Sequence, residues 1–306
     1  MTRAAAVDCG TNTIRLLVAD LDPETGAEQE LAREMKVVRL GQDVDRTGRL
    51  ADAALQRVFA AVEEYAATID RLDAETVRFC ATSAARDAAN VEAFLDGVRQ
   101  RLGVDAEIIS GDQEAALTYD GATRSLGHDV AAPYLVVDIG GGSTELILGD
   151  GHGRVRAARS LDIGSVRMTE RRMPSDPPTE QEVAAAVADV DAALDGCPVP
   201  VEEAATLIGV AGTVTTVAAH VLGLPGYDRE RVHHAVLAAD EVHRGTAQLL
   251  AMTVAERRAL PYMHPGRADV IGGGALILDR VLRHTKVGSV LVSETDILDG
   301  IAWSVA

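Results

Sequence analysis

The sequence is poor in cysteine, in aromatic residues and in long apolar runs. Its three cysteines, Cys9, Cys80 and Cys197, show no CxxC spacing, which argues against a disulfide framework or a structural zinc site. Aromatic residues make up only 3% of the chain, so aliphatic side chains must build the core. No apolar run approaches the ~18 residues of a membrane span, and the N-terminus lacks the regions of a signal peptide. We therefore expect a cytoplasmic protein with no membrane contact.

Several catalytic signatures are missing too. The chain has no GxxxxGK[ST] phosphate loop, no HExxH and no GxSxG, so a P-loop NTPase, a zinc hydrolase and a serine hydrolase are all disfavoured. Lysine and arginine total 29 against 47 aspartates and glutamates, which gives a net charge of −18. So acidic a chain does not attract nucleic acid without a local basic patch, and no nucleic-acid partner is expected.

An internal repeat is the most informative feature that is present. Residues 7–20 have the sequence VDCGTNTIRLLVAD and residues 137–150 have VDIGGGSTELILGD, an ungapped match at an offset of 130 residues. This offset is too long for a solenoid, and a chain of 306 residues is long enough for two cores. Each copy predicts a strand, a glycine-containing turn and a second strand. We expect two lobes that each open with this unit.

Strands and helices alternate along the rest of the chain, which predicts an α/β fold. Apolar spacing predicts helices over 51–69, 90–101, 113–122, 180–194, 229–250 and 268–283 and in the last residues. Thr179 is expected to cap the fourth of these. Further strands are expected over 77–81, 207–210 and 289–292. We place one lobe at 1–124 and the other at 125–306, with a final helix that can pack back on the first lobe.

The two turns are the main candidate site. Asp8 and Asp138 occupy matching positions at the ends of the first strands, and carboxylates are ligands that Mg²⁺ or Mn²⁺ prefers. Small turn residues let backbone N–H groups and hydroxyls surround an anion. The expected phosphate-binding residues of the turns are Gly10, Thr11, Asn12, Thr13, Gly140, Gly141, Gly142, Ser143 and Thr144. A tight turn without a ligand is the alternative for either copy.

Three charged residues near predicted strand ends are further candidates. Glu114 opens a predicted helix, where it is either a general base that deprotonates water or a helix-capping group. Glu145 follows the triple-glycine turn and either faces the same site or lies in solvent. Arg86 follows the strand over 77–81 and either binds an anion or pairs with Asp87 or another surface acid.

Two other glycine clusters and an arginine cluster leave their roles open. Gly212 and Thr213 belong to a third strand-to-helix turn, which suits phosphate binding or close packing. Residues 272–274, all glycine, interrupt a predicted helix and have the same two interpretations. The arginine cluster is either a substrate track or ordinary surface charge; it comprises Arg154, Arg156, Arg159, Arg167, Arg171 and Arg172.

Together these motifs resemble the exopolyphosphatase and guanosine pentaphosphate phosphatase (Ppx/GppA) family of the actin, Hsp70 and sugar-kinase superfamily. The family's motif order is matched by VDCGTNTIRLLV, CATSAARDA, ISGDQEA, VVDIGGGSTELILG, IGVAGTVTT and SETDILDGI. The resemblance covers nearly the whole chain. The segments DPPT, MHPGRADVIGGGA and SETDILDGIA are most similar to the short actinobacterial branch.

The resemblance implies two ribonuclease-H-like lobes around a cleft and a metal-assisted phosphohydrolase. It implies that Glu114 positions and activates water, and that Asp138 and Glu145 act around Mg²⁺ and the scissile phosphate. Arg86 and the glycine turns are implied to hold phosphates. The implied reaction is release of terminal orthophosphate from inorganic polyphosphate, or removal of the 5′ γ-phosphate of guanosine pentaphosphate (pppGpp). The resemblance also implies a homodimer.

Other interpretations remain open on the same scaffold. One is a sugar or acetate kinase that uses ATP, and another is a non-catalytic sensor of polyphosphate or (p)ppGpp. A chaperone-like or filament-forming relative is disfavoured, because the chain is short and has no appended peptide-binding domain. Thr215 and Asp299 stand where many relatives carry a basic residue. This loss of two cations favours a short polyphosphate or a nucleotide over a long polyphosphate chain.

Overall fold

The computed structural model describes residues 1–86, 88–127 and 129–306. By its internal contacts the chain divides into two units, residues 1–121 with 297–306, and residues 122–296. The lobe ranges of 1–124 and 125–306 stay a prediction about separate folding units. Within the described residues, none of the helices combines the length and apolar character needed to cross a membrane.

The first unit is built on a five-stranded mixed sheet in the order β3-β2-β1-β4-β5. Its strands are β1 (Thr2–Cys9), β2 (Thr13–Asp22), β3 (Ala27–Val37), β4 (Thr76–Ala81) and β5 (Ala106–Ile108). β1 pairs antiparallel with β2 and parallel with β4, and β4 pairs parallel with β5. The first copy of the repeat is therefore the β1–β2 hairpin, and three parallel strands end at one edge of the sheet.

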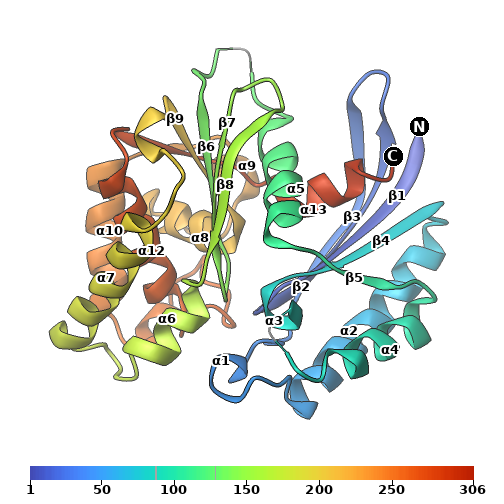
Figure 1. The fold of residues 1–306 in the computed structure, drawn as a ribbon, viewed down its shortest axis with the longest axis horizontal. Helices are drawn as coiled ribbons and strands as arrows, with labels where there is room; N and C mark the ends of the chain where they lie inside the picture. The colour runs from blue at the N-terminus through green and yellow to red at the C-terminus, as the bar shows by residue number, and fades with distance from the viewer. Residues whose placement is uncertain (87, 128) are drawn as a thin grey trace. The chain divides into compact units, whose positions relative to one another are not determined.

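Side-chain alternation along β1 divides the first unit into two apolar layers. Ala5 and Val7 face α2 (Asp52–Arg71) and α4 (Val91–Leu102), whereas Ala4 and Ala6 face α13 (Ile297–Trp303). Figure 1 shows α2 and α4 on one side of this sheet and α13 on the other. The remaining helices of the unit are α1 (Val44–Thr47), α3 (Ser83–Arg86) and α5 (Gly111–Thr123).

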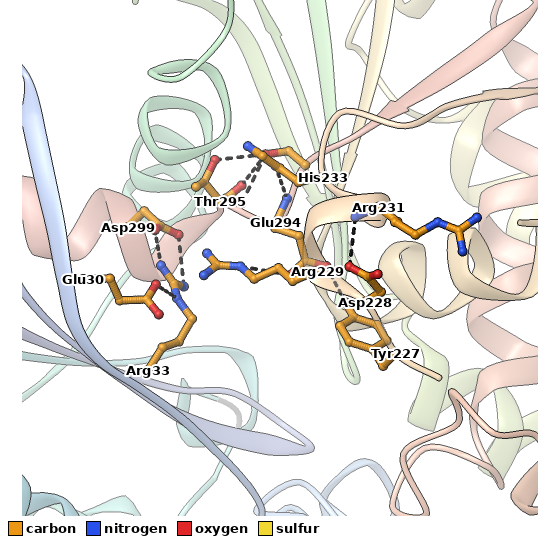
Figure 2. A network of polar contacts seen from close by, with 11 residues as sticks. Glu30, Arg33, Tyr227, Asp228, Arg229, Arg231, His233, Glu294, Thr295 and Asp299 are labelled. Carbon is orange, nitrogen blue, oxygen red and sulfur yellow. Dashed lines mark hydrogen bonds and ion pairs between the residues drawn. The ribbon is translucent and has the colours of Figure 1, made fainter. Parts of the chain in front are cut away.

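A buried ion pair ties α13 to the sheet of the first unit. Asp299 is 2% exposed, and its Oδ1 accepts a hydrogen bond of 2.5 Å from Arg33 Nη2 on β3. Figure 2 shows Arg33 held between Asp299 and Glu30. Asp299 stands where many relatives carry a basic residue, but the unit still has a cation at this point. Arg33 on β3 supplies it and neutralises the Asp299 carboxylate.

The second unit repeats this topology on a six-stranded sheet in the order β10-β11-β9-β6-β7-β8. Its strands are β6 (Tyr134–Ile139), β7 (Thr144–Gly149), β8 (Val155–Leu161), β9 (Thr206–Val210), β10 (Val236–Ala238) and β11 (Ser289–Val292). Strands β6, β9 and β11 are parallel. The predicted α/β class, with two mixed sheets flanked by helices, is confirmed, and both copies of the repeat form the expected hairpins.

Helices cover one face of the second sheet around Leu135, Val137 and Ile139. They are α6 (Ser165–Arg172), α7 (Glu180–Asp195), α8 (Ala211–Val221), α9 (Arg229–Val232), α10 (Ala239–Ala251), α11 (Val254–Arg258) and α12 (Ile271–His284), with the short 3₁₀ helix η1 (Val201–Glu203). The capping prediction for α7 is confirmed, since the Thr179 side chain accepts from the Glu182 amide.

Among the differences between the structure and the predicted elements, two have a clear physical reason. A single helix over 229–250 is wrong, because His234 adopts a positive φ of 62° and the next residues form β10, which pairs antiparallel with β11. Strand β3 was not predicted at all. Its charged sequence is poor in β-formers, but an edge strand with exposed polar side chains tolerates such a composition.

We predict that Gly300→Ala destabilises the first unit. A Cβ at Gly300 would lie 2.0 Å from the carbonyl oxygen of Leu117 on α5, so α13 must move away from α5. The expected loss is about 1–3 kcal/mol of unfolding free energy, the usual scale of overpacking, measured by urea denaturation. Gly288→Ala is the matched control, because a Cβ there meets no atom within 4 Å. Equal stability of the two variants would contradict the prediction.

Candidate functional site

The candidate residues of the first unit lie at one edge of its sheet. Parallel strands β1, β4 and β5 end there. They lead into the turn at 10–13, into α3 with Arg86, and into α5 with Glu114. Crevices at the carboxyl ends of parallel strands are the usual ligand sites of open α/β sheets.

Asp8 lies directly opposite Arg15 in the β1–β2 hairpin. The Asp8 carboxylate is 4% exposed, and its Oδ2 accepts from Arg15 Nε at 3.0 Å and from Nη2 at 2.6 Å. Directly opposed side chains share one face of the sheet, so this register places a cation on the acid. The arginine weighs against the predicted metal role of Asp8, which stays a prediction.

The carbonyl groups of the first turn are held by the chain that follows β3. The Thr11 oxygen accepts from the Gly41 amide at 2.9 Å. The Asn12 oxygen accepts from the amides of Val38 at 3.0 Å and Arg39 at 2.9 Å. Because a peptide unit is planar and trans, the N–H groups of these peptides point the opposite way. The predicted phosphate-binding turn thus has fixed amide directions.

Glu114 pairs with Arg86 rather than capping its helix. The capping box of α5 is made by Ser110 and Gln113, whose side chains bond each other's backbone amides at 3.2 and 2.9 Å. Glu114 is 6% exposed, and its Oε2 lies 3.2 Å from Arg86 Nη1. The structure therefore brings the candidate base and the candidate phosphate ligand together. Asp87, the partner predicted by name for Arg86, lies outside the described residues.

Two acids oppose each other in the second hairpin. Asp138 on β6 and Glu145 on β7 are cross-strand partners, only 7% and 2% exposed. Ser160, the neighbour of Glu145 on β8, donates from Oγ to Glu145 Oε1 at 2.7 Å. Like charges directly opposite each other are destabilising. This pair is the counterpart of Asp8 and Arg15, with an acid where the first copy has a cation.

The opposed acids fit a hard divalent cation. Mg²⁺ is usually held by one or two carboxylates, with waters and substrate phosphates completing its shell. Over 1–86, 88–127 and 129–306, no three histidine, cysteine or acidic residues gather into a fuller metal cluster. Two buried carboxylates on one face match the smaller ligand set.

The second turn uses one predicted phosphate ligand internally. The Thr144 hydroxyl is fully buried and donates to the Ile163 oxygen at 2.6 Å. The Gly140 amide donates to the Ser143 oxygen at 3.0 Å, as the Gly10 amide does to Thr13 at 2.9 Å in the first copy. The Gly140 amide is thus used inside the turn. The backbone amides of residues 141–143 are therefore the stronger candidates for anion binding.

The third turn, at the start of α8, is contacted by an arginine that the sequence patterns did not single out. Arg267 donates from Nη1 to the Gly212 oxygen and to Thr216 Oγ1, each at 3.3 Å. A Cβ at Gly212 would lie 2.2 Å from Arg267 Nη2, so only glycine allows this approach. Ala211 has a positive φ of 67°, a strained conformation that is enriched at functional sites. The available sequence signal was the Pro265-Gly266 pair, which starts a turn directly before Arg267.

The glycines at 272–274 serve close packing. A Cβ at Gly274 would lie 2.5 Å from Thr213 Cγ2, and one at Gly273 would lie 2.8 Å from the Ser165 oxygen. α12 therefore packs against both α6 and the start of α8. Of the two interpretations of this glycine cluster, the structure shows the packing one.

Thr215 takes part in a polar cluster at the carboxyl end of β11. Its hydroxyl bonds to Tyr227, whose own hydroxyl donates to Glu294. Figure 2 shows Tyr227, Glu294 and His233 in this cluster. The Glu294 amide donates to His233 Nδ1 at 3.1 Å, which requires a neutral imidazole nitrogen. Burial, with His234 and Arg229 nearby, lowers the pKa of His233 to about 4.

The arginines of the predicted cluster have different environments and do not form one continuous surface. Arg156 pairs with Glu203 and Arg172 pairs with Asp189, both at 2.6 Å. Arg167 instead turns inward and donates from Nε to the Gly142 oxygen at 2.7 Å. Two members are therefore ordinary surface ion pairs, whereas one contacts the triple-glycine turn.

Comparisons with known proteins agree on one family. A model of the Ppx/GppA phosphatase family matches residues 18–306. Exopolyphosphatase 2 of Mycobacterium tuberculosis is 44% identical over 100% of this chain and 99% of its own. A solved Ppx/GppA structure from Aquifex aeolicus is 31% identical, with a TM-score of 0.84 over 99% of this chain and 97% of that one. The guanosine-5'-triphosphate,3'-diphosphate pyrophosphatase of Vibrio atlanticus is 37% identical over 55% of this chain and 33% of its own.

We predict that Arg15→Gln strongly destabilises the protein. The substitution removes the cation from a buried carboxylate, and breaking a buried ion pair from one side costs about 3–5 kcal/mol. Urea unfolding followed by circular dichroism measures the loss. Arg46→Gln is the control, because its pair with Asp43 is largely exposed, at 75% and 48%. Similar unfolding free energies for the two variants would rule out a stabilising charge neutralisation of Asp8 by Arg15.

Proposed function

Because the chain belongs to the Ppx/GppA phosphatase family, we propose that it is an exopolyphosphatase. It hydrolyses the terminal phosphoanhydride bond of inorganic polyphosphate and releases orthophosphate. The observation that carries this proposal is the 44% identity with exopolyphosphatase 2 over the full length of both chains. The ion pair of the buried Glu114 with the partly exposed Arg86 supports it, since this pair joins a candidate base to a candidate phosphate ligand.

In the proposed mechanism a water molecule attacks the terminal phosphorus in line with the leaving oxygen. Glu114 accepts the proton of that water, and Arg86 holds a phosphate oxygen while fixing the Glu114 carboxylate. Backbone amides of the turn at 10–13 bind further phosphate oxygens. The amides of the turn at 140–143 are proposed as phosphate ligands of the second unit. No covalent intermediate with the enzyme is required.

Asp138 and Glu145 are proposed to hold Mg²⁺, or Mn²⁺, on the face they share. When bound, the ion supplies positive charge that offsets the charge of the phosphate groups. Ser160 holds one oxygen of Glu145, which leaves the carboxylate with a defined orientation. Asp8 is the weaker candidate ligand, because Arg15 already bonds it.

Hydrolysis of pppGpp is the second candidate function. The similarity to the Vibrio atlanticus pyrophosphatase favours it, and that similarity covers 55% of this chain. A non-catalytic sensor of polyphosphate or (p)ppGpp is the remaining alternative. A cytoplasmic location and a homodimer belong to the same proposal and rest on the family resemblance; fractionation and analytical ultracentrifugation test them.

We predict that the purified protein with Mg²⁺ releases orthophosphate from polyphosphate, and that Glu114→Gln lowers turnover by at least about 100-fold, the usual scale for a general base. Short polyphosphate, long polyphosphate, pppGpp and ATP are compared in parallel. Asp112→Gln, an exposed acid in the same helical turn, is the control and keeps wild-type turnover. Ligand binding without release from any substrate would favour a sensor. Wild-type turnover in a folded Glu114→Gln protein would refute the assignment of the base.

We predict that Mg²⁺ raises the melting temperature of the wild type but not that of Glu145→Gln. Without metal, the variant should be the more stable of the two, because it removes one of two opposed charges. Differential scanning calorimetry in EDTA and in MgCl₂ measures both effects. Glu203→Gln, an exposed acid of the same unit, keeps the wild-type response. A full Mg²⁺ shift in Glu145→Gln would exclude Glu145 as a ligand.

A further inference from the structure

The carbonyl groups of the triple-glycine turn all point to the start of α6. The Gly140 oxygen accepts from the Ser165 amide at 2.9 Å. The Gly141 oxygen accepts from the amides of Val166 at 2.9 Å and Arg167 at 3.1 Å. The Gly142 oxygen accepts from the side chain of Arg167, through Nε, at 2.7 Å. One short helix therefore fixes three successive peptide units.

These contacts set the direction of the amides. In a planar trans peptide the N–H group points away from the carbonyl of the same unit. With the oxygens of residues 140–142 bonded to α6, the N–H groups of Gly141, Gly142 and Ser143 point to the opposite side. Successive amides directed to one side form a concave anion-binding nest.

The two copies of the repeat hold the third carbonyl differently. Asn12 and Gly142 are equivalent at the offset of 130 residues. Backbone amides of Val38 and Arg39 hold the Asn12 oxygen, whereas a side chain holds that of Gly142. Gly142 lies on one side of the peptide that joins it to Ser143, and glycine tolerates more backbone conformations than the asparagine of the first copy. A free peptide between Gly142 and Ser143 could turn its carbonyl oxygen toward the phosphate.

Arg167 is well placed to prevent this rotation. The Arg167 side chain is 12% exposed. The Asp162 carboxylate lies 4.0 Å from its Nη2 and is 81% exposed, so this ion pair is a weak surface contact. A Cβ at Gly164 would lie only 2.4 Å from the Gly141 oxygen, so glycine at this position lets the start of α6 pack closely against the turn. The guanidinium thus holds a fixed position relative to the Gly142 carbonyl.

We propose that Arg167 is a positioning residue, whose Nε–H bond to the Gly142 oxygen holds the Ser143 amide toward a phosphate oxygen of the substrate. The inference rests on the proposed function of the turn as a phosphate site. It adds a residue that acts through the backbone, without contact to the reacting atoms. Its charge assists by polarising the same peptide unit.

The test compares Arg167→Ala, Arg167→Lys and Arg172→Ala. Arg172 lies on the same helix and pairs with Asp189, so Arg172→Ala should keep the wild-type kcat/KM for polyphosphate. Arg167→Ala should lose at least about 10-fold in kcat/KM, the scale of one charge-assisted hydrogen bond. Added guanidinium ion at millimolar concentration should restore part of that loss. Arg167→Lys keeps the charge without the guanidinium geometry, and it should stay impaired.

A second measurement separates this proposal from the proposed function. In protein labelled with ¹⁵N-glycine and ¹⁵N-serine, orthophosphate should shift the amide signals of Gly142 and Ser143 in the wild type but not in Arg167→Ala. Loss of turnover with every substrate would defeat the exopolyphosphatase proposal and leave this result standing. Wild-type kcat/KM in Arg167→Ala or in Arg167→Lys, or amide signals that respond equally in wild type and variant, would overturn the role of Arg167.

Discussion

Residues that lie directly opposite each other on antiparallel strands share one face of the sheet, and the charge at both glycine turns depends on this constraint. In the first hairpin it places Arg15 on Asp8, and in the second it places Glu145 beside Asp138. Both hairpins have the same strand pairing, so their charges differ at one position, which is Arg15 in the first and Glu145 in the second. A cation of the chain pairs with the first acid, whereas the equivalent position of the second hairpin carries another acid.

The turns themselves depend on peptide orientation more than on side chains. Each uses a following segment to bind its carbonyl groups, residues 38–41 in the first unit and 165–167 in the second. Hydroxyl groups are less available than the motifs suggest, since Thr144 bonds Ile163 and Thr11 bonds Ser83. A site that relies on amides keeps its geometry when side chains vary, provided the carbonyls stay fixed.

Much of this could be predicted from the sequence, because the repeat carries its own signal. The two hairpins, the α/β class and the capped helix after Thr179 follow from local patterns. Other features could not be predicted, since they depend on contacts between distant residues. Arg167 bonds an oxygen 25 positions earlier, and Arg33 neutralises an acid 266 positions later. No local pattern of charge distinguishes these arginines from those that pair at the surface.

The last ten residues complete the first unit, and this has a consequence for synthesis on the ribosome. The face of the first sheet formed by Ala4, Ala6 and Leu17 receives its covering helix only when α13 emerges. Translation of residues 122–296 takes roughly 10–35 s at rates of about 5–20 residues/s. During that interval the part of this face that α13 covers in the finished protein stays exposed. The earliest part of the chain to be made is thus among the last to be buried.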